Sequence, residues 1–230
     1  MMRIATTAAL LITSPAFGQT LLGAGVGWSR STTHEQGGPL ISLLGERRWS
    51  AASSRLVLDA QIPATRQVTW RDNGTGRVLP TGPWNDGHER EVILSTTLSM
   101  VSIAADHLFV IDSDRPDDRI DLRLGPGVAW SMEQLRYDQS VKDVTSDTTE
   151  FHRVDRSRST ANVRVTLGAA YRLPLGYLLV EATSEMLTFD GREEGSGGSG
   201  WLQRQMFRFA AVFPIGGART NDTDGPDPDL

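Results

Sequence analysis

The sequence predicts an all-β protein, an eight-stranded antiparallel up-and-down barrel that crosses a membrane. Three observations lead to this fold class. Long segments alternate residue by residue between an apolar and a polar face, which is the period of a strand between two environments. The connections between these segments are alternately long and short, as in transmembrane barrels. No apolar stretch reaches the ~18 residues that a transmembrane helix needs.

The alternation is clearest in residues 119–133 and 159–173. In the first of these segments Leu122 and Trp130 belong to a continuous apolar face, whereas Arg123 belongs to a face of charged, glycine and other small residues. A helix would need apolar residues at spacings of three and four, and that spacing would leave half of this apolar set exposed. Both segments therefore predict strands with one side in contact with lipid or with a sheet core.

The N-terminus predicts an exported protein. Arg3 precedes the apolar run 4–12, and residues 13–18 supply small side chains for cleavage before Gln19. This is the pattern of a secretory signal peptide, so we exclude residues 1–18 from the fold. A short buried helix is the alternative.

Composition narrows the function classes. The chain has no cysteine and a net charge of −5, which becomes −6 when Arg3 is removed with the signal peptide. A net acidic chain does not favour nucleic acid as a partner. All basic residues except Lys142 are arginines, which suit interior ion pairs. A base-composition bias of the genome is the alternative explanation.

Eight strands are expected in the barrel domain 19–215. Each has at least a partial period-two pattern, the second being the weakest. They are expected at 20–30, 39–48, 53–62, 90–102, 119–132, 159–173, 177–189 and 201–213. The acidic segment 216–230 is rich in proline and glycine and is expected to be a disordered tail.

The connections predict which end of the barrel faces outward. The long polar ones, expected to be extracellular loops, are 31–38, 63–89, 134–158 and 190–200. The segments 49–52 and 174–176 are tight turns, and an even strand number places both termini on their side, which would be the periplasm. The fourteen-residue segment 105–118 does not fit this alternation of long and short connections, because a short turn is expected at its place. Extended neighbouring strands, a small periplasmic element and extra strands are the three explanations.

The end of the barrel domain carries a family resemblance. Phe207, Phe209 and Phe213 alternate with other residues and close the last expected strand. This pattern resembles the last strand of outer-membrane β-barrel proteins of Gram-negative bacteria, most closely the small eight-stranded OmpA-like and Opacity-type barrels. The resemblance implies a bacterial outer-membrane location, outer-membrane lipid around the barrel, and assembly by a barrel-assembly machinery that recognises these aromatic residues. In the family the aromatic residue commonly ends the barrel, whereas here Pro214 and the tail follow it.

Charged residues on the polar faces are expected to form an ion network inside the barrel, because an eight-stranded barrel is only wide enough for its own side chains. They are Arg55, Asp59, Arg119, Asp121, Arg123, Arg164, Arg172, Glu181, Glu185, Arg204 and Arg208. The strand with Glu181 and Glu185 lies between two arginine-bearing strands, which allows cross-strand salt bridges. We favour a plug of paired charges over an ion path, because buried charges need partners.

Four aromatic residues near expected strand ends are candidates for the two membrane interfaces, where amphipathic rings anchor. They are Trp28, Trp130, Tyr171 and Trp201.

Enzymatic chemistry has little support. His34, His88 and His152 fall on the expected loop rim, but a hydrolase would need a serine or carboxylate within hydrogen-bond reach. His88-Glu89 and His152-Arg153-Val154-Asp155 are nominal candidates only. No catalytic residue, cofactor or metal site is therefore expected.

The sequence favours a non-enzymatic role in envelope integrity or in surface contact through the outer loops, which could bind an extracellular ligand. A narrow ion-conducting channel, a rim hydrolase and a soluble periplasmic lipocalin-like barrel are the alternatives. In the last of these, the apolar faces would turn inward and the charged faces would meet water.

Overall fold

The computed structural model describes residues 19–32, 35–49, 51–72, 78–79, 82–83, 88–111, 119–189 and 204–215. The expected signal peptide 1–18, the tail 216–230, His34 and Trp201 lie outside these residues, as does the expected loop 190–200.

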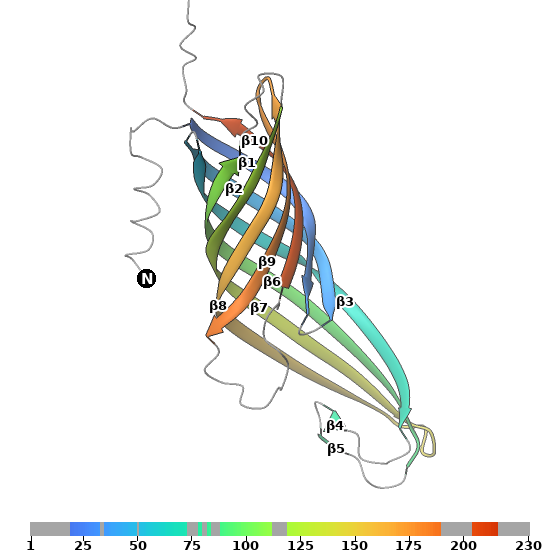
Figure 1. Ribbon diagram of the computed structural model, residues 1–230. Helices are drawn as coiled ribbons and strands as arrows, with labels where there is room; N and C mark the ends of the chain where they lie inside the picture. Colours follow the sequence, from blue (N-terminus) through green and yellow to red (C-terminus); the bar gives the residue numbers. More distant parts are fainter. Residues whose placement is uncertain are drawn as a thin grey trace, which may run out of the picture.

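The described residues form strands joined by turns and loops (Figure 1). In chain order the strands are β1 (Gln19–Ser31), β2 (Gln36–Arg48), β3 (Ala52–Asp72), β4 (Val78–Leu79), β5 (Gly82–Pro83), β6 (Arg90–Ile111), β7 (Ile120–Asp143), β8 (Thr149–Leu173), β9 (Gly176–Phe189) and β10 (Arg204–Pro214). β4 and β5 pair only with each other among these strands, as a small two-stranded sheet.

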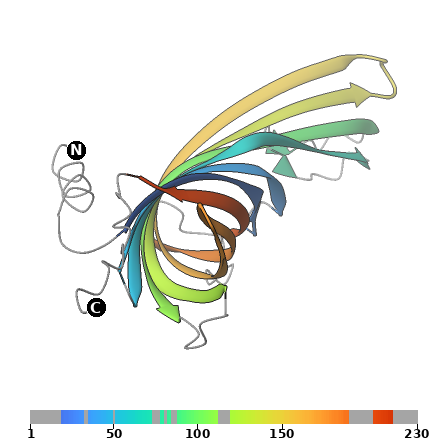
Figure 2. The same cartoon turned by 90° about the horizontal axis from the view of Figure 1, so that it is seen from above.

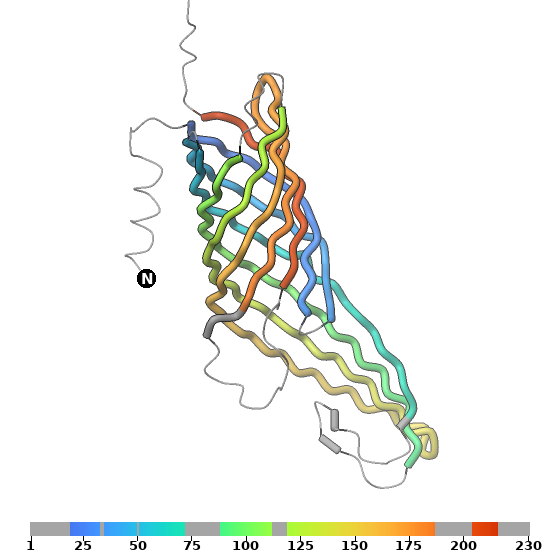
Figure 3. The backbone as a smooth tube through the Cα atoms, in the orientation of Figure 1, coloured from blue at the N-terminus to red at the C-terminus, as the bar shows by residue number. Residues whose placement is uncertain are grey.

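The other eight strands form a closed antiparallel barrel in the order β1-β10-β9-β8-β7-β6-β3-β2. Strands that follow one another along the chain are neighbours, and β1 pairs with β10 to close the ring (Figure 3). The predicted eight-stranded up-and-down barrel is therefore confirmed. Closure pairs the backbone groups of every barrel strand on both sides, which a spanning sheet needs in lipid.

The barrel has two different ends. The tight turns 49–51 and 174–175 lie at one end, where β1 begins and β10 finishes, and we call this the turn end. The opposite end, which we call the loop end, has the connections 32–35, 73–89, 144–148 and 190–203.

Four neighbouring strands continue past the loop end of the ring. β3, β6, β7 and β8 project to one side of the barrel when it is viewed from above (Figure 2). The residues involved, which we call the extension sheet, are 64–72, 90–98, 135–143 and 149–158. β2 pairs with β3 only as far as Gln61, and β9 meets β8 only from Ala161 onward. Within the described residues, the outer edges of this sheet therefore have no neighbouring strand.

The extension sheet corrects two expected loops. Most of 134–158 is strand, with a turn at 144–148, and β3 continues to Asp72 inside the expected loop 63–89. Both faces of these stretches carry polar residues, so the hydrophobic alternation that marks a strand is absent. The expected loop 31–38 is also shorter, since β2 already begins at Gln36. In the segment 105–118, which is too long for the tight turn expected there, β6 continues to Ile111 and so extends the expected fourth strand.

A bulge in β3 separates its barrel part from its extension. Gln61 is opposite Met100 and Ala64 is opposite Leu98, so β3 uses one residue more than β6 at this point. Pro63 lies inside the bulge, where its missing N–H breaks no ladder hydrogen bond. The extra residue reverses the alternation of inward and outward side chains along β3. Trp70 and the other even-numbered residues of the extension therefore lie on the same side of the sheet as the odd-numbered residues of β3 in the barrel.

Inward and outward faces differ sharply in chemistry. Large apolar side chains on the outside remain exposed, for example Val26 at 63% and Phe209 at 60%, whereas Arg164 and Asp59 inside are fully buried. Such a continuous apolar exterior is unfavourable in contact with water but favourable in contact with lipid. The alternative of a soluble lipocalin-like barrel is therefore wrong, because that fold needs the reverse arrangement.

Candidate functional site

The barrel interior contains a network of ion pairs. At least seven arginines and seven carboxylates of the described residues take part in it. They are Arg48, Arg55, Arg123, Arg164, Arg172, Arg204 and Arg208 with Glu46, Asp59, Asp106, Asp121, Glu133, Glu181 and Glu185. Each of these charges has a partner of the opposite sign, which a low-dielectric interior requires.

Glu181 on β9 is the centre of the network. Its carboxylate pairs with Arg55 from β3, with Arg208 from β10 at 3.2 Å and with Arg123 from β7 at 3.7 Å. Arg123 also pairs with Glu46 of β2 at 2.6 Å. Side chains from five different strands therefore meet at one place in the barrel.

A second group of ion pairs continues this centre toward the loop end. Arg208 Nη2 lies 2.7 and 2.8 Å from the two carboxylate oxygens of Asp59, so a single nitrogen of the guanidinium group donates to both. Arg164 joins Asp106 at 2.9 Å and Glu185 at 3.4 Å. Each of these five charged residues has more than one partner, so removal of one of them would leave at least two others without a full counter-charge.

Ion pairs also occur at both ends of the interior. Asp121 near the turn end accepts from Arg48 and from Arg172, whose side chain is 39% exposed. Near the loop end, Arg204 pairs with Glu133 and with Glu185.

The described interior leaves little open volume beside Arg204. A cavity of about 10 Å³ lies between Glu133, Arg158, Asn162 and Glu185, which is close to the smallest volume that holds one water molecule. Side chains therefore fill this part of the interior almost completely.

The structure places nine of the eleven charges expected inside as buried residues of the interior. Arg172 is only half-buried, at the turn end. Arg119 was also expected inside, but it is exposed and precedes the first residue of β7. The alternation that included Arg119 does not apply to it because the strand has not yet begun.

Several network residues were missing from the sequence-based set. The sequence does not point to Asp106, because 105–118 is predicted to be a connection, or to Glu46, because its strand alternates weakly. Glu133 lies at the border of an expected loop. The useful signal was continued alternation, since Asp106 follows Ser102 and Ala104 on the inward face of β6.

The outward face of the extension sheet is covered by cross-strand ion pairs. Arg153 donates to Asp138 at 2.6 Å and Arg136 to Asp155 at 2.9 Å, and all four side chains are substantially exposed. Phe151 lies on the same face and is 80% exposed. On the opposite face Trp70 packs against the buried Val92 and Val141. This sheet therefore has a small apolar core on one face and a charged face in water.

The three described histidines each lie close to a polar side chain. His88 lies 3.0 Å from Asp143 at the tip of the extension sheet, and His152 lies 3.4 Å from Glu150. His107 contacts Ser54, but at the turn end and on the outer wall.

The pair at the tip has a measurable electrostatic consequence. His88 and the backbone N–H groups of Ser146 and Thr145 hold the pKa of Asp143 at about 2, below its ordinary value of 3.8. A lowered pKa means that the carboxylate stabilises this turn above its ordinary pKa. That contribution is lost as the pH falls through about 2.

We therefore expect His88→Ala to raise the pKa of Asp143 toward 3.8. The measurement is an NMR titration of the side-chain carboxyl carbon. Asp147 is the internal control, since its pKa is lowered by Lys142 and not by a histidine. A wild-type Asp143 that already titrates near its ordinary value would contradict the contact.

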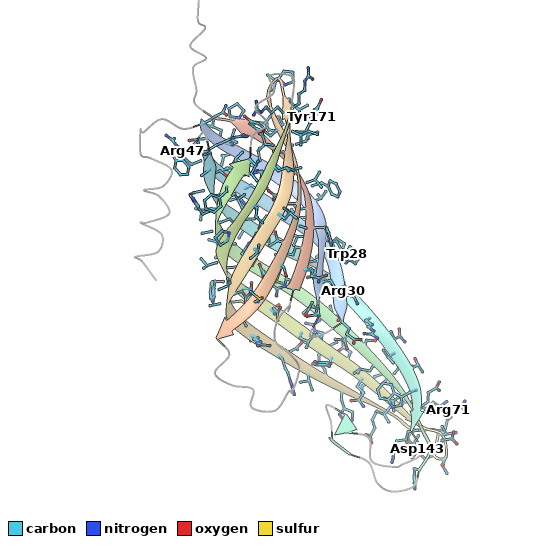
Figure 4. The ribbon with its side chains drawn as sticks, viewed as in Figure 1. Trp28, Arg30, Arg47, Arg71, Asp143 and Tyr171 are labelled. Atoms are coloured by element: carbon cyan, nitrogen blue, oxygen red, sulfur yellow. The ribbon has the colours of Figure 1, made fainter. Side chains whose placement is uncertain are left out.

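Aromatic residues occupy the outer surface near both barrel ends. Trp28 and Trp130 are 51% and 47% exposed, and Tyr171 is 39% exposed near the turn end. Figure 4 shows Trp28 and Tyr171 at opposite ends of the barrel. Phe207, Phe209 and Phe213 of β10 also point outward and are exposed.

Within the described residues, no group of three histidine, cysteine, aspartate or glutamate side chains could hold a metal ion. The same part of the chain contains no helix that is long and apolar enough to cross a membrane.

Comparison with known proteins finds likenesses among solved structures. No family model matches the sequence, and no curated protein matches it significantly. Neisserial surface protein A is 10% identical, with 85% of this chain and 95% of that chain covered and a TM-score of 0.46. Ail, the attachment invasion locus protein of Yersinia pestis, is 12% identical, with 86% and 99% covered and a TM-score of 0.42. A complex of Ail with the heparin analogue sucrose octasulfate gives 11% identity and the same coverages and TM-score. The assignment of the barrel fold to this chain rests on the pairing of its own strands.

Proposed function

We propose that this chain is a non-enzymatic surface protein of a bacterial outer membrane, with a closed barrel as its anchor and the extension sheet as its interaction surface. The turn end, where β1 begins and β10 finishes, faces the periplasm in this arrangement. The loop end and the extension sheet face the cell exterior.

The observation that carries this proposal is the length of four strands. A span of ~9–11 tilted residues crosses the hydrocarbon layer, whereas β3, β6, β7 and β8 have 21, 22, 24 and 25 residues. Beyond the ring, the outward faces change from apolar side chains to ion pairs such as Arg153–Asp138. The surplus length is therefore folded, charged and outside the lipid.

The edges of the extension sheet suggest how a partner would bind. β3 and β8 each have a single neighbour there among the described strands. The open side of such an edge offers unpaired N–H and C=O groups to an extended segment of another protein. Envelope integrity without a surface partner is the competing role. The packed charges inside the barrel do not favour ion conduction.

Removal of the extension sheet separates these roles. Thr65 is opposite Thr97, and Leu135 is opposite Arg156, so two-residue turns can join each pair and leave the ring complete. We expect bacteria with this variant to lose attachment to protein-coated wells, or cell-to-cell settling, as fully as a deletion strain. Their resistance to detergent should stay at the wild-type level, because the anchor is intact.

The opposite result would assign the activity to the barrel itself: wild-type attachment by the shortened variant, with detergent sensitivity only in the deletion strain. The absence of cysteine provides an orientation control. Ser146→Cys should react with an impermeant maleimide on intact cells, whereas Leu175→Cys should react only after the outer membrane is opened.

A further inference from the structure

The extension sheet has a long open edge on β8. This strand begins at Thr149 and first pairs with β9 at Ala161, so residues 149–160 have only β7 beside them among the described strands. The other edge, on β3, is interrupted by its bulge and by Pro63, two features that discourage the addition of a strand. Of the two edges, β8 is therefore the one that favours a further strand.

Two-fold symmetry limits how β8 can pair with the β8 strand of a second copy of this chain. In a two-fold antiparallel pair one residue lies opposite itself, because opposite residues point to the same face of the sheet. With Arg153 or Asp155 at this centre, two like charges would face each other, which is destabilising. With Val154 at the centre, Arg153 of each copy lies opposite Asp155 of the other.

The register centred on Val154 continues an ion-pair pattern that the sheet already contains. Across β7 and β8, Arg153 pairs with Asp138 at 2.6 Å and Arg136 pairs with Asp155 at 2.9 Å. In the paired copies these residues form a row of alternating sign over four strands, and the two-fold axis repeats the row. Charged residues on an edge strand discourage pairing when they meet like charges. In this register each of these charges meets the opposite sign.

Phe151 provides a second fit in the same register. It lies on the outward face, strongly exposed, and would be opposite Ser157 of the other copy. Ser157 borders a depression of about 440 Å³, which is also lined by its register neighbours Gln134 on β7 and Ser99 on β6. The ring of each copy can therefore lean over Ser157 into the depression of the other, which buries a large aromatic side chain.

The direction of the strands determines where the second copy is located. Strands of a barrel are tilted by ~35–45° from its axis, and the extension strands continue away from the ring along the axis as well as to one side (Figure 1). Antiparallel pairing reverses the strand direction, so the two barrels would point in opposite directions. Copies in one flat membrane point in the same direction. The second copy therefore belongs to a facing membrane.

We propose that the extension sheet binds a second copy of this chain on a neighbouring cell, through antiparallel pairing of the two β8 edges with Val154 opposite Val154. This inference rests on the surface role proposed above and gives that surface a partner. Backbone hydrogen bonds along residues 149–159 form the contact, while the pairs between Arg153 and Asp155 and the packing of Phe151 fix the register. Exposed ion pairs are weak singly, so attachment depends on many copies acting together on two facing cells.

Cross-linking through a single cysteine tests the register, because the chain has no cysteine of its own. Opposite residues of an antiparallel pair have Cα atoms ~4.5–5.5 Å apart, within the range of a disulfide. Val154→Cys should therefore form a disulfide-linked dimer on intact cells treated with a mild oxidant. Ser157→Cys is the matched control on the same edge. It should form no dimer, since its counterpart in the other copy lies ~20 Å away along the strand.

Two strains that carry Val154→Cys, one with a size tag on the protein, test the location of the contact. After the strains are mixed and oxidised, we expect dimers of mixed size. Adding Phe151→Ala should slow dimer formation roughly tenfold, the effect of losing one buried aromatic anchor. Val68→Ala removes an exposed apolar side chain from β3 and should leave the rate unchanged. Heat-modifiable migration on a gel verifies that each variant is folded.

Equal dimer formation by Val154→Cys and Ser157→Cys would indicate random collision and would overturn the register. Dimers without mixed sizes would overturn the contact between cells. If Val154→Cys forms no dimer while the shortened variant still loses attachment to protein-coated wells, this inference fails and the surface role stands with a different protein as partner. Mixed dimers together with wild-type attachment by the shortened variant would instead overturn the surface role and leave self-pairing in place.

Discussion

Glu181→Gln is expected to destabilise the folded barrel by about 3–5 kcal/mol, the cost of removing one partner from a buried ion pair. Glu181 is only 2% exposed, and its carboxylate contacts Arg55, Arg123 and Arg208. The glutamine retains the shape of the side chain but removes its charge. Three guanidinium groups would then share the remaining carboxylates in an interior that water reaches poorly.

Equilibrium unfolding in urea, followed by tryptophan fluorescence of protein refolded into lipid vesicles, measures this loss. Asp138→Asn is the matched control, because Asp138 pairs with Arg153 on the exposed face of the extension sheet. An exposed pair contributes up to about 1 kcal/mol. Similar losses in the two variants would mean that the interior is hydrated and that the network does not stabilise the barrel as we describe.

The barrel part of the fold was accessible to sequence reasoning because each barrel strand lies between lipid and a charged interior. Because of this contrast, apolar and polar residues alternate along each barrel strand, as in β7 from Leu122 to Met132. The extension sheet has polar surroundings on its outward face, and cross-strand pairs such as Arg136–Asp155 hold it together. Such pairs become visible only when the strands are aligned, so the sequence alone predicts loops for these stretches.

The same distinction applies to the ion network. Arg164 and Arg204 lie opposite Glu185 in adjacent strands, so these contacts could be anticipated from strand order. The contact of Arg55 with Glu181 joins β3 to β9 across the interior. Strand order alone does not give such a contact, because it depends on the stagger and closure of the whole ring.

Closure itself gives the second large effect, which we expect from Gly27→Ala. Gly27 lies on the inward face of β1 opposite Arg208 of β10, at the seam where the first and last strands meet. A Cβ atom at this position would collide with the backbone carbonyl oxygen of Phe207. A backbone carbonyl cannot move away by changing a rotamer, as a side chain can. The strands β1 and β10 would therefore have to separate at the seam. We expect a loss of about 3 kcal/mol, the upper part of the usual cost of overpacking.

Gly45→Ala is the matched control for this seam variant. It makes the same chemical change in the neighbouring strand, but the added atom meets only the flexible side chain of Leu22. Since alanine also restricts the unfolded chain more than glycine does, Gly45→Ala should be neutral or slightly stabilising. The fraction of heat-modifiable protein after refolding, together with the urea midpoint, compares the two variants. Equal urea midpoints and equal refolded fractions for the two variants would show that β1 and β10 do not approach as closely as the register indicates. Of the two glycines, only Gly27 lies where an added Cβ atom would meet backbone.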